Sequence, residues 1–375
     1  MMQKLGDIAT YINGYAFKPA DRGLKGLPII RIQDLTGNSY DLGFYDGIYP
    51  KKIEINNGDI LISWSGSLGI FLWNGGKALL NQHIFKVVFD KKDIDKHYFL
   101  FAVKEKLNEM SLKTHGATMK HIIKSDFENI TISLPDLNEQ KRISNMLLKI
   151  ENLIKMRKNQ IQHYDTLTKS LFVEMFGDPV ISSNGKKQVP FSEFIASIRY
   201  GTSQPPVFST NGEFKFIRAT NIKKGKIIPK DMLRIDAIDA NKIKKCQLTG
   251  NEIIIVRSGV NAGDTGIITS QYIGDYAGYD IIVSIDLKKG NPVYFNELIN
   301  THYMEQIIKP LTIRSAQPHL NAQQVKELPM VLATLEEQNN FAEVIEQIDK
   351  HKSVVQKSLD ETQLLFDSLM QKYFG

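Results

Sequence analysis

Few residues in this 375-residue sequence are spaced as a catalytic or metal site requires. No glycine-rich phosphate loop, no His-Glu-x-x-His helix motif and no Cys/His pair at zinc spacing occurs. His115 and His121 are the closest histidines, and their position around Gly116 is typical of a polar loop. The single cysteine, Cys246, excludes a disulfide framework and indicates a reducing compartment.

Two short motifs come closer to known chemistry. Asn291-Pro292-Val293-Tyr294 is similar to an adenine-gripping motif of amino-methyltransferases, but it lacks the second proline and a glycine-rich cofactor loop. Asp136 with Glu139-Gln140-Lys141 is similar to a metal-dependent nuclease signature, but it lies where a helix should begin. There Asp136 or Asn138 would cap the helix, and Glu139 would suit its dipole. We therefore expect no catalysis, metal or cofactor in this chain.

Groups suited to nucleic acid are more numerous. Arginine, lysine, asparagine, glutamine and aromatic residues gather in loops and at strand ends, and they occupy corresponding places in the two halves of the chain. In the first half they are Tyr15, Lys18, Arg22, Lys25, Arg31, Gln33, Trp64, Ser65, Gln82, His83, Lys113, His115, Thr118 and Lys120. In the second half they are Arg199, Tyr200, Thr202, Gln204, Arg218, Asn221, Lys223, Lys224, Arg257, Ser258, Arg314, Gln317 and His319.

Each of these residues has an ordinary alternative, which is a solvated surface position. Arg31 and Arg218 stand at matching places and could instead pair with Asp34 or another carboxylate. Lysines along the predicted helices, such as Lys149 and Lys155, are typical of a solvated coiled-coil face.

Two long helices are predicted to position these groups. Segment 137–177 aligns without a gap with segment 335–375, and both repeat apolar residues in a 4-3 spacing, which predicts a coiled coil. Each helix would be about 60 Å long. We place their starts after Pro135 and Pro329. The predicted helix–helix seam is Ile143, Leu147, Ile150, Ile154, Ile161, Tyr164 and Leu171 with Phe341, Ile345, Ile348, Val355, Leu359, Phe366 and Leu369.

Each helix follows a β-rich block of short apolar runs and Gly, Asn and Asp turns. Each block also contains one predicted helix, 95–109 or 292–309. The fold prediction is α+β: two β-rich globular domains joined by two long helices packed as an antiparallel coiled coil, with internal pseudo-two-fold symmetry. The predicted segments are a domain at 1–135, a helix at 136–177, a domain at 178–334 (with a linker at 178–188) and a helix at 335–375.

Composition is consistent with this organisation. The chain is 42% hydrophobic and 23% charged, which is ordinary for globular proteins. Its net charge of +6 and pI near 9.0 permit a nucleic-acid partner without requiring one. No run of eighteen apolar residues and no signal-peptide pattern is present, so we expect a cytoplasmic protein with no membrane partner.

The ordered phrases NGYAF…GLPIIRIQDL, NNGDILISWSGSLG and HGATMKHI in one half, with FIRATNI, IIIVRSGVNAGDTG and SAQPHLN in the other, carry a resemblance along the whole length. The sequence resembles the specificity subunits of type I restriction-modification systems. The resemblance implies two target recognition domains, each binding half of an asymmetric bipartite site on double-stranded DNA. At about 60 Å per helix, the gap would be at most about 18 base pairs.

The resemblance also implies partners. The helical regions would dock two modification (methyltransferase) subunits, which carry S-adenosylmethionine, and restriction subunits that use ATP and Mg²⁺ could join. Three alternatives stay open at this stage. They are a specificity subunit of a system with a fused nuclease-methyltransferase, a self-contained methyltransferase, and a coiled-coil scaffold that does not bind DNA.

Overall fold

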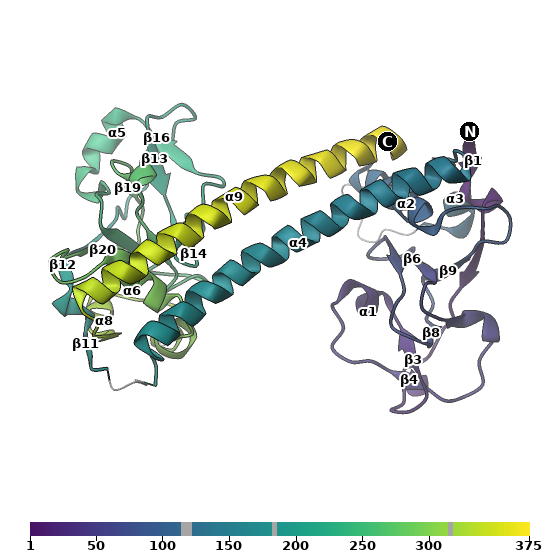
Figure 1. Ribbon diagram of the computed structural model, residues 1–375, viewed down its shortest axis with the longest axis horizontal. Coiled ribbons are helices and arrows are strands. Elements are labelled where there is room, and N and C mark those ends of the chain that lie inside the picture. The colour runs from purple at the N-terminus through teal and green to yellow at the C-terminus, as the bar shows by residue number, and fades with distance from the viewer. Residues whose placement is uncertain (114–121, 182–185, 314–317) are drawn as a thin grey trace. The chain divides into compact units, whose positions relative to one another are not determined.

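The computed structural model describes residues 1–113, 122–181, 186–313 and 318–375, with only the backbone described at 110–113. It divides into two compact units. Unit 1 is Met1–Lys158 with Lys357–Gly375, and unit 2 is Asn159–Gln356. Each contains its own sheets and its own portions of the two long helices (Figure 1).

Unit 1 is built on two four-stranded sheets, in the orders β2-β9-β6-β7 and β4-β3-β8-β5, and a short β1-β10 pair. Its strands are β1 Met2–Lys4, β2 Thr10–Asn13, β3 Leu27–Ile30, β4 Phe44–Tyr45, β5 Glu54–Ile55, β6 Ile60–Ser63, β7 Gly69–Leu72, β8 Ala78–Leu80, β9 Ile84–Val88 and β10 Thr131–Ser133. Its short helices are α1 Ile32–Thr36, α2 Lys96–Lys113 and α3 Lys124–Glu128.

Unit 2 repeats this arrangement with sheets β12-β20-β17-β18 and β16-β13-β19 and short pairs β11-β21 and β14-β15. Its strands are β11 Gln188–Pro190, β12 Ile195–Tyr200, β13 Phe214–Ile217, β14 Ile222–Lys223, β15 Lys226–Ile227, β16 Leu233–Ile235, β17 Glu252–Ile255, β18 Thr265–Ile267, β19 Tyr276–Ala277, β20 Ile281–Ile285 and β21 Pro329–Val331. Its short helices are α5 Ala237–Lys242, α6 Pro292–Ile299, α7 Lys309–Thr312 and α8 Ala322–Lys326.

The central strands are apolar because both of their faces are covered. Every residue of β6 and of β17 is buried, and each strand pairs with neighbours on both sides. In both units a glycine follows the first strand of this sheet at a point of close backbone approach. A Cβ on Gly14 would lie 2.0 Å from the Asn81 carbonyl oxygen, and one on Gly201 would lie 1.5 Å from that of Gly278. Only glycine fits at these two positions.

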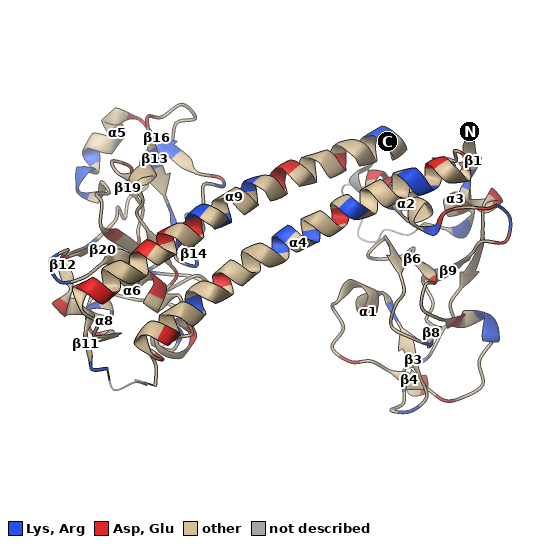
Figure 2. Cartoon of the chain, viewed as in Figure 1, with Lys and Arg blue, Asp and Glu red and all other residues tan. Residues whose placement is uncertain are grey.

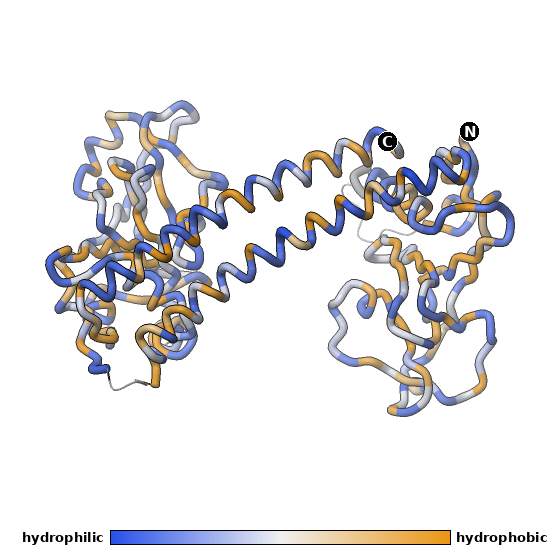
Figure 3. The backbone as a smooth tube through the Cα atoms, in the orientation of Figure 1, coloured by the Kyte–Doolittle hydropathy of each residue, from blue (hydrophilic) through white to orange (hydrophobic). Residues whose placement is uncertain are grey.

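The two long helices are α4, Leu137–Phe176, and α9, Leu335–Phe374. The Asp136 carboxylate accepts the Glu139 N–H and caps α4. Thr334 and Glu337 exchange side chain-to-backbone hydrogen bonds at the start of α9, as in a capping box. Gly177, at φ 82°, ends α4. Hydrophobic residues recur along both helices (Figure 3).

The helix α9 begins at Leu335, where the predicted segment 335–375 begins, and not directly after Pro329, which starts strand β21 and pairs with β11. One expected helix end was wrong. The helix expected at 292–309 ends at Ile299, and a separate π-helical turn, Met304–Ile308, follows it. Asn300 ends α6 because its amide donates both to the Thr265 hydroxyl and to the Asn296 carbonyl oxygen.

The predicted seam residues are all buried or half-buried. In unit 1 the Arg157 guanidinium donates to the Ser358 carbonyl oxygen across the helix pair. In unit 2 the ring of Phe172 packs against Phe341. Phe172 and Phe176 are fully buried although the 4-3 spacing omits them, because this end of α4 also packs on the core of the domain beneath it.

A buried glutamine joins each long helix to its domain in the same way. The Gln140 amide oxygen accepts the Asp95 N–H in unit 1, and the Gln338 amide oxygen accepts the Asn291 N–H in unit 2. The same two glutamines donate to the carbonyl oxygens of Pro135 and Ala333. The structural repeat therefore extends to these hydrogen bonds, although few residues are identical between the two halves.

Candidate nucleic-acid interface

Strand pairing gathers polar and aromatic residues at one edge of the larger sheet in each unit. In unit 1, the end of β2 and the end of β6 both pair with the beginning of β9. In unit 2, the ends of β12 and β17 both pair with the beginning of β20. The residues that follow these strand ends therefore lie together, and we call each group the strand-end edge of its unit.

The strand-end edge of unit 1 is largely aromatic. Trp64 donates its backbone N–H to the His83 carbonyl oxygen and its indole N–H to the Asn13 side chain. Its ring stacks on Phe85 with centroids 5.7 Å apart and meets the His83 ring edge-on at 4.8 Å. Tyr15 is 42% exposed beside them. Among its described residues, this edge is aromatic and not charged.

The strand-end edge of unit 2 is centred on a cation. Arg257 lies 4.5 Å from the ring centroids of both Tyr200 and Tyr279. Its backbone N–H is donated to the carboxylate of Asp280, and burial raises the pKa of that carboxyl to about 6. Ser258 and His319 meet through a 3.1 Å hydrogen bond next to it. A pocket of about 380 Å³ opens beside this edge, lined in part by Thr202, Arg218, Tyr279 and Asp280.

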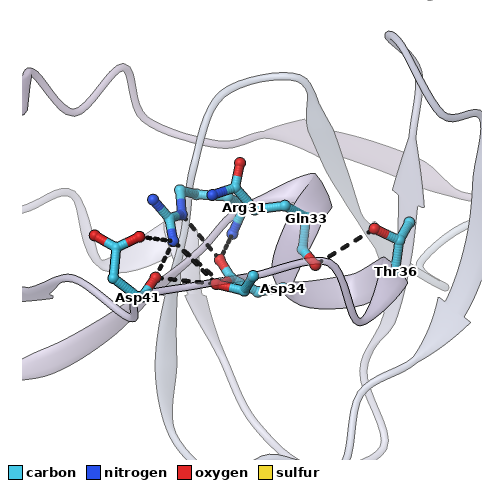
Figure 4. A network of polar contacts seen from close by, with 6 residues as sticks. Arg31, Gln33, Asp34, Thr36 and Asp41 are labelled. Carbon is cyan, nitrogen blue, oxygen red and sulfur yellow. Dashed lines mark hydrogen bonds and ion pairs between the residues drawn. The ribbon is translucent and has the colours of Figure 1, made fainter. Parts of the chain in front are cut away.

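Arg31, predicted to contact DNA, instead holds its own domain together. Its side chain is 7% exposed and pairs with the equally buried Asp34 and with Asp41. Figure 4 shows the guanidinium enclosed between these two acidic residues. Both carboxylates raise the pKa of Arg31. The alternative weighed for this residue, a structural ion pair, is the one that the contacts support.

Arg199 and Asn221 also serve the fold. Arg199 pairs with the buried Glu252 at 2.7 Å and donates to the carbonyl oxygens of Lys245 and Gln247. Asn221 is fully buried and donates to the carbonyl oxygens of Ile228 and Lys230. Because these donors are already used inside the domain, Arg199 and Asn221 have structural roles in place of the predicted DNA contacts. One terminal N–H of Arg218 is donated to the Asp231 carbonyl oxygen, and the Arg218 Nε is buried without a partner among the described residues.

The remaining described candidates differ in exposure. Ser65 is buried, whereas Thr202 is half-buried. The exposed ones are Lys18, Arg22, Lys25, Gln33, Gln82, Gln204, Lys223 and Lys224. His115, Thr118, Lys120, Arg314 and Gln317 lie outside the described residues, as does the side chain of Lys113.

Basic residues on the long helices alternate with acidic ones (Figure 2). On α4 Arg142 pairs with Glu139, and on α9 Lys350 pairs with Glu346. This alternation fits a solvated helix surface better than a phosphate-binding stripe.

Both motifs that came close to known chemistry have structural roles. Asp136 caps α4, as noted, and Glu139 pairs with Arg142. Asn291 caps α6 by accepting the Val293 N–H. Within the described ranges, no group of three or more His, Cys, Asp or Glu side chains could hold a metal ion. Likewise, none of the described helices is long and apolar enough to cross a membrane.

Sequence inspection missed Tyr279 and Asp280. In the strand register Ile281 matches Phe85, because each pairs with the last residue of the first strand of its sheet. The carbonyl oxygens of Ile84 and Asp280 accept the N–H groups of Gly14 and Gly201, so Asp280 takes the place of Ile84 and Tyr279 that of Gln82 and His83. Aligning the two halves in this register would have identified Tyr279, whereas Asp280 falls opposite the apolar Ile84.

Comparison with known proteins gives consistent matches. The family model for the type I restriction modification DNA specificity domain matches residues 1–163 and 195–362. The MjaVIII type I restriction enzyme specificity subunit of Methanocaldococcus jannaschii is 26% identical over 96% of this chain and 88% of its own. The EcoBI specificity subunit of Escherichia coli is 22% identical over 98% and 83%. The solved S subunit from M. genitalium superposes with a TM-score of 0.61 at 15% identity, over 100% of this chain and 96% of its own.

Proposed function

Because the chain belongs to the type I restriction-modification DNA specificity family, we propose that each unit recognises one half of a bipartite DNA target. The observation that supports this most directly is the contrast between equivalent edges on one scaffold. Unit 1 presents Trp64 where unit 2 presents Arg257, and Ile84 where unit 2 presents Asp280. Different side chains at the same place on the same fold would select different bases, so the two half-sites should differ in sequence.

We further propose that α4 and α9 set the spacing of the half-sites and dock two modification subunits. Each helix contributes residues to both units, so a change in its length acts on both. Deleting one heptad, residues 151–157, should alter the tolerated gap or abolish activity. Unchanged target spacing in that deletion would contradict this role of the helices.

The chemistry would reside in the partners. In this proposal the modification subunits supply S-adenosylmethionine and methylate adenine, and restriction subunits, where present, use ATP and Mg²⁺. Two observations on this chain support the division. The residues of its methyltransferase-like and nuclease-like motifs, Asn291 and Asp136, are occupied in capping helices.

The test is a methylome. The chain is expressed with its neighbouring methyltransferase gene in a host that lacks DNA methylation, and modified adenines are located by sequencing. A split, asymmetric motif that appears only when this chain is present is the expected result. Methylation that is the same without the chain would overturn the proposal and favour a scaffold that does not recognise DNA. A neighbouring gene that fuses nuclease and methyltransferase would assign the chain to that type of system.

A further inference from the structure

We propose that Arg257 recognises a guanine in the half-site bound by unit 2, and that Tyr200 and Tyr279 hold its side chain for this purpose. This inference rests on the proposed function. We call these three residues the Arg257 clamp. They come from the ends of three segments, because Tyr200 ends β12, Arg257 follows β17, and Tyr279 precedes β20.

The two rings restrict the guanidinium. The carbon at its centre lies 4.5 Å from the centroid of each tyrosine ring. Tyr200 is itself fixed, because its hydroxyl oxygen accepts the N–H of Ala322 at the start of α8. Two aromatic neighbours at this distance favour the planar cation and limit its rotamers. The N–H groups of a guanidinium lie in its plane, so limiting the orientation of the group also limits the directions in which Arg257 donates hydrogen bonds.

The backbone of Arg257 is fixed as well. Its N–H is donated to Asp280, and its carbonyl oxygen accepts the N–H of Leu320 at 2.8 Å. Its Nε faces the His319 ring at 3.4 Å. The Arg257 side chain is held at its backbone, at Nε and over the clamp rings. It therefore loses little conformational entropy when it binds a partner.

The terminal nitrogens of Arg257 donate to no residue that the structure describes, although the group is half-buried. Other arginines of unit 2 contrast with it. Arg199 and Arg234 donate their terminal N–H groups to carbonyl and carboxylate oxygens of their own domain. A preorganised guanidinium with unused donors is suited to bind an external acceptor pair.

Guanine provides such a pair. Its O6 and N7 atoms accept two parallel N–H groups in the plane of the base, and arginine is the side chain most often found there. A phosphate also accepts two such bonds, but it gives no preference for one base over another. The equivalent residue of unit 1, Trp64, has a single N–H, which is donated to Asn13. At this equivalent position, the geometry assigns a guanine contact to Arg257 and none to Trp64.

The experiment repeats the methylome with three variants of the full chain. Arg257→Met removes the two parallel donors and the charge while keeping an unbranched side chain, so discrimination for guanine at one position of one half-site should fall by roughly 5- to 150-fold. Tyr279→Leu should relax the same position, since it removes one ring from the clamp. Tyr279→Phe keeps the ring and should retain the wild-type motif. This rescue separates positioning from a loss of stability.

Each result decides between outcomes. If Arg257→Met leaves the motif unchanged, guanine recognition by Arg257 is refuted. If it lowers methylation equally at every target and weakens the salt dependence of binding, Arg257 contacts a phosphate and the inference is overturned. Relaxation in both half-sites would also contradict it. If the wild-type chain directs no motif at all, the proposed function fails first, and that result is distinct from the others. Because Tyr279 is 44% exposed, its variants test the inference even where the Arg257 variant does not fold.

Discussion

Replacing Asp280 with asparagine should stabilise unit 2 at neutral and alkaline pH. The Asp280 side chain is buried at the strand-end edge, and burial raises its pKa from 3.8 to about 6. Folding therefore disfavours the charged form. An asparagine oxygen can still accept the Arg257 N–H that the carboxylate accepts now, so the variant removes the buried charge while keeping this hydrogen bond.

The magnitude follows from the pKa shift. About two pKa units correspond to roughly 3 kcal/mol of unfolding free energy at pH 8. Because the folded-state pKa lies above the unfolded one, the folded chain binds the proton more tightly between about pH 4 and 6. The stability of the wild-type chain therefore falls as the pH rises through that window. The gain in the variant should be about 3 kcal/mol at pH 8, about half of that at pH 5, and nearly absent below pH 4.

Thermal unfolding combined with hydrogen exchange of β17 and β20 measures this effect in unit 2 itself. A gain of 3 kcal/mol should raise the melting temperature of this unit by about 6–12 °C at pH 8. The matched control is Asp236→Asn, which changes an exposed carboxylate of the same unit. No stabilisation by Asp280→Asn at pH 8, or an equal gain at pH 4 and pH 8, would refute the reasoning.

Three further substitutions test the packing. Gln338→Leu should destabilise unit 2 by about 2–4 kcal/mol, since two buried backbone groups lose their partner. Faster hydrogen exchange at 291–299 would show this loss of stability, and an effect confined to unit 1 would contradict the prediction. Phe172→Ala should lower the unfolding free energy of unit 2 by about 3–5 kcal/mol, as measured by chemical denaturation. A loss under 1 kcal/mol would mean that α4 does not pack on the domain as described. Gly201→Ala should prevent unit 2 from folding because of its contact with the Gly278 carbonyl oxygen, as seen by circular dichroism, whereas Gly23→Ala, with room for a Cβ, should not.

The long helices could be predicted from the sequence because their information is local and repeated. A 4-3 spacing of apolar residues recurs in both halves in the same register, and each predicted seam position is buried or half-buried. The spacing missed Phe172 and Phe176 because a periodicity describes one contact face. At its end, α4 has a second face, which covers the domain core.

The roles of the arginines could not be decided in this way. Asp34, three residues from Arg31, was open as its partner, but no local pattern chooses between that ion pair and a DNA contact, and the partner of Arg199 is distant in sequence. Arg199 pairs with Glu252, which lies two strands away in the same sheet. Arg31 pairs with Asp41 across a loop whose course no local pattern gives. A basic residue in a polar loop has the same appearance in the sequence whether its donors bind DNA or the protein. The surrounding acceptors distinguish the two cases, and only the fold supplies them.

Unit 1 is assembled from two stretches of chain, and this affects the order of folding during synthesis. Its last portion, Lys357–Gly375, is made only after the whole of unit 2, which is continuous. Until then residues 1–158 have left the ribosome, but the rings of Phe366 and Phe374, which pack against Phe101 and Tyr98, have not yet been made. Unit 2 can therefore complete its core first, while unit 1 waits with an uncovered apolar surface. The later half of the chain would fold before the earlier one, the reverse of the usual order in which domains mature.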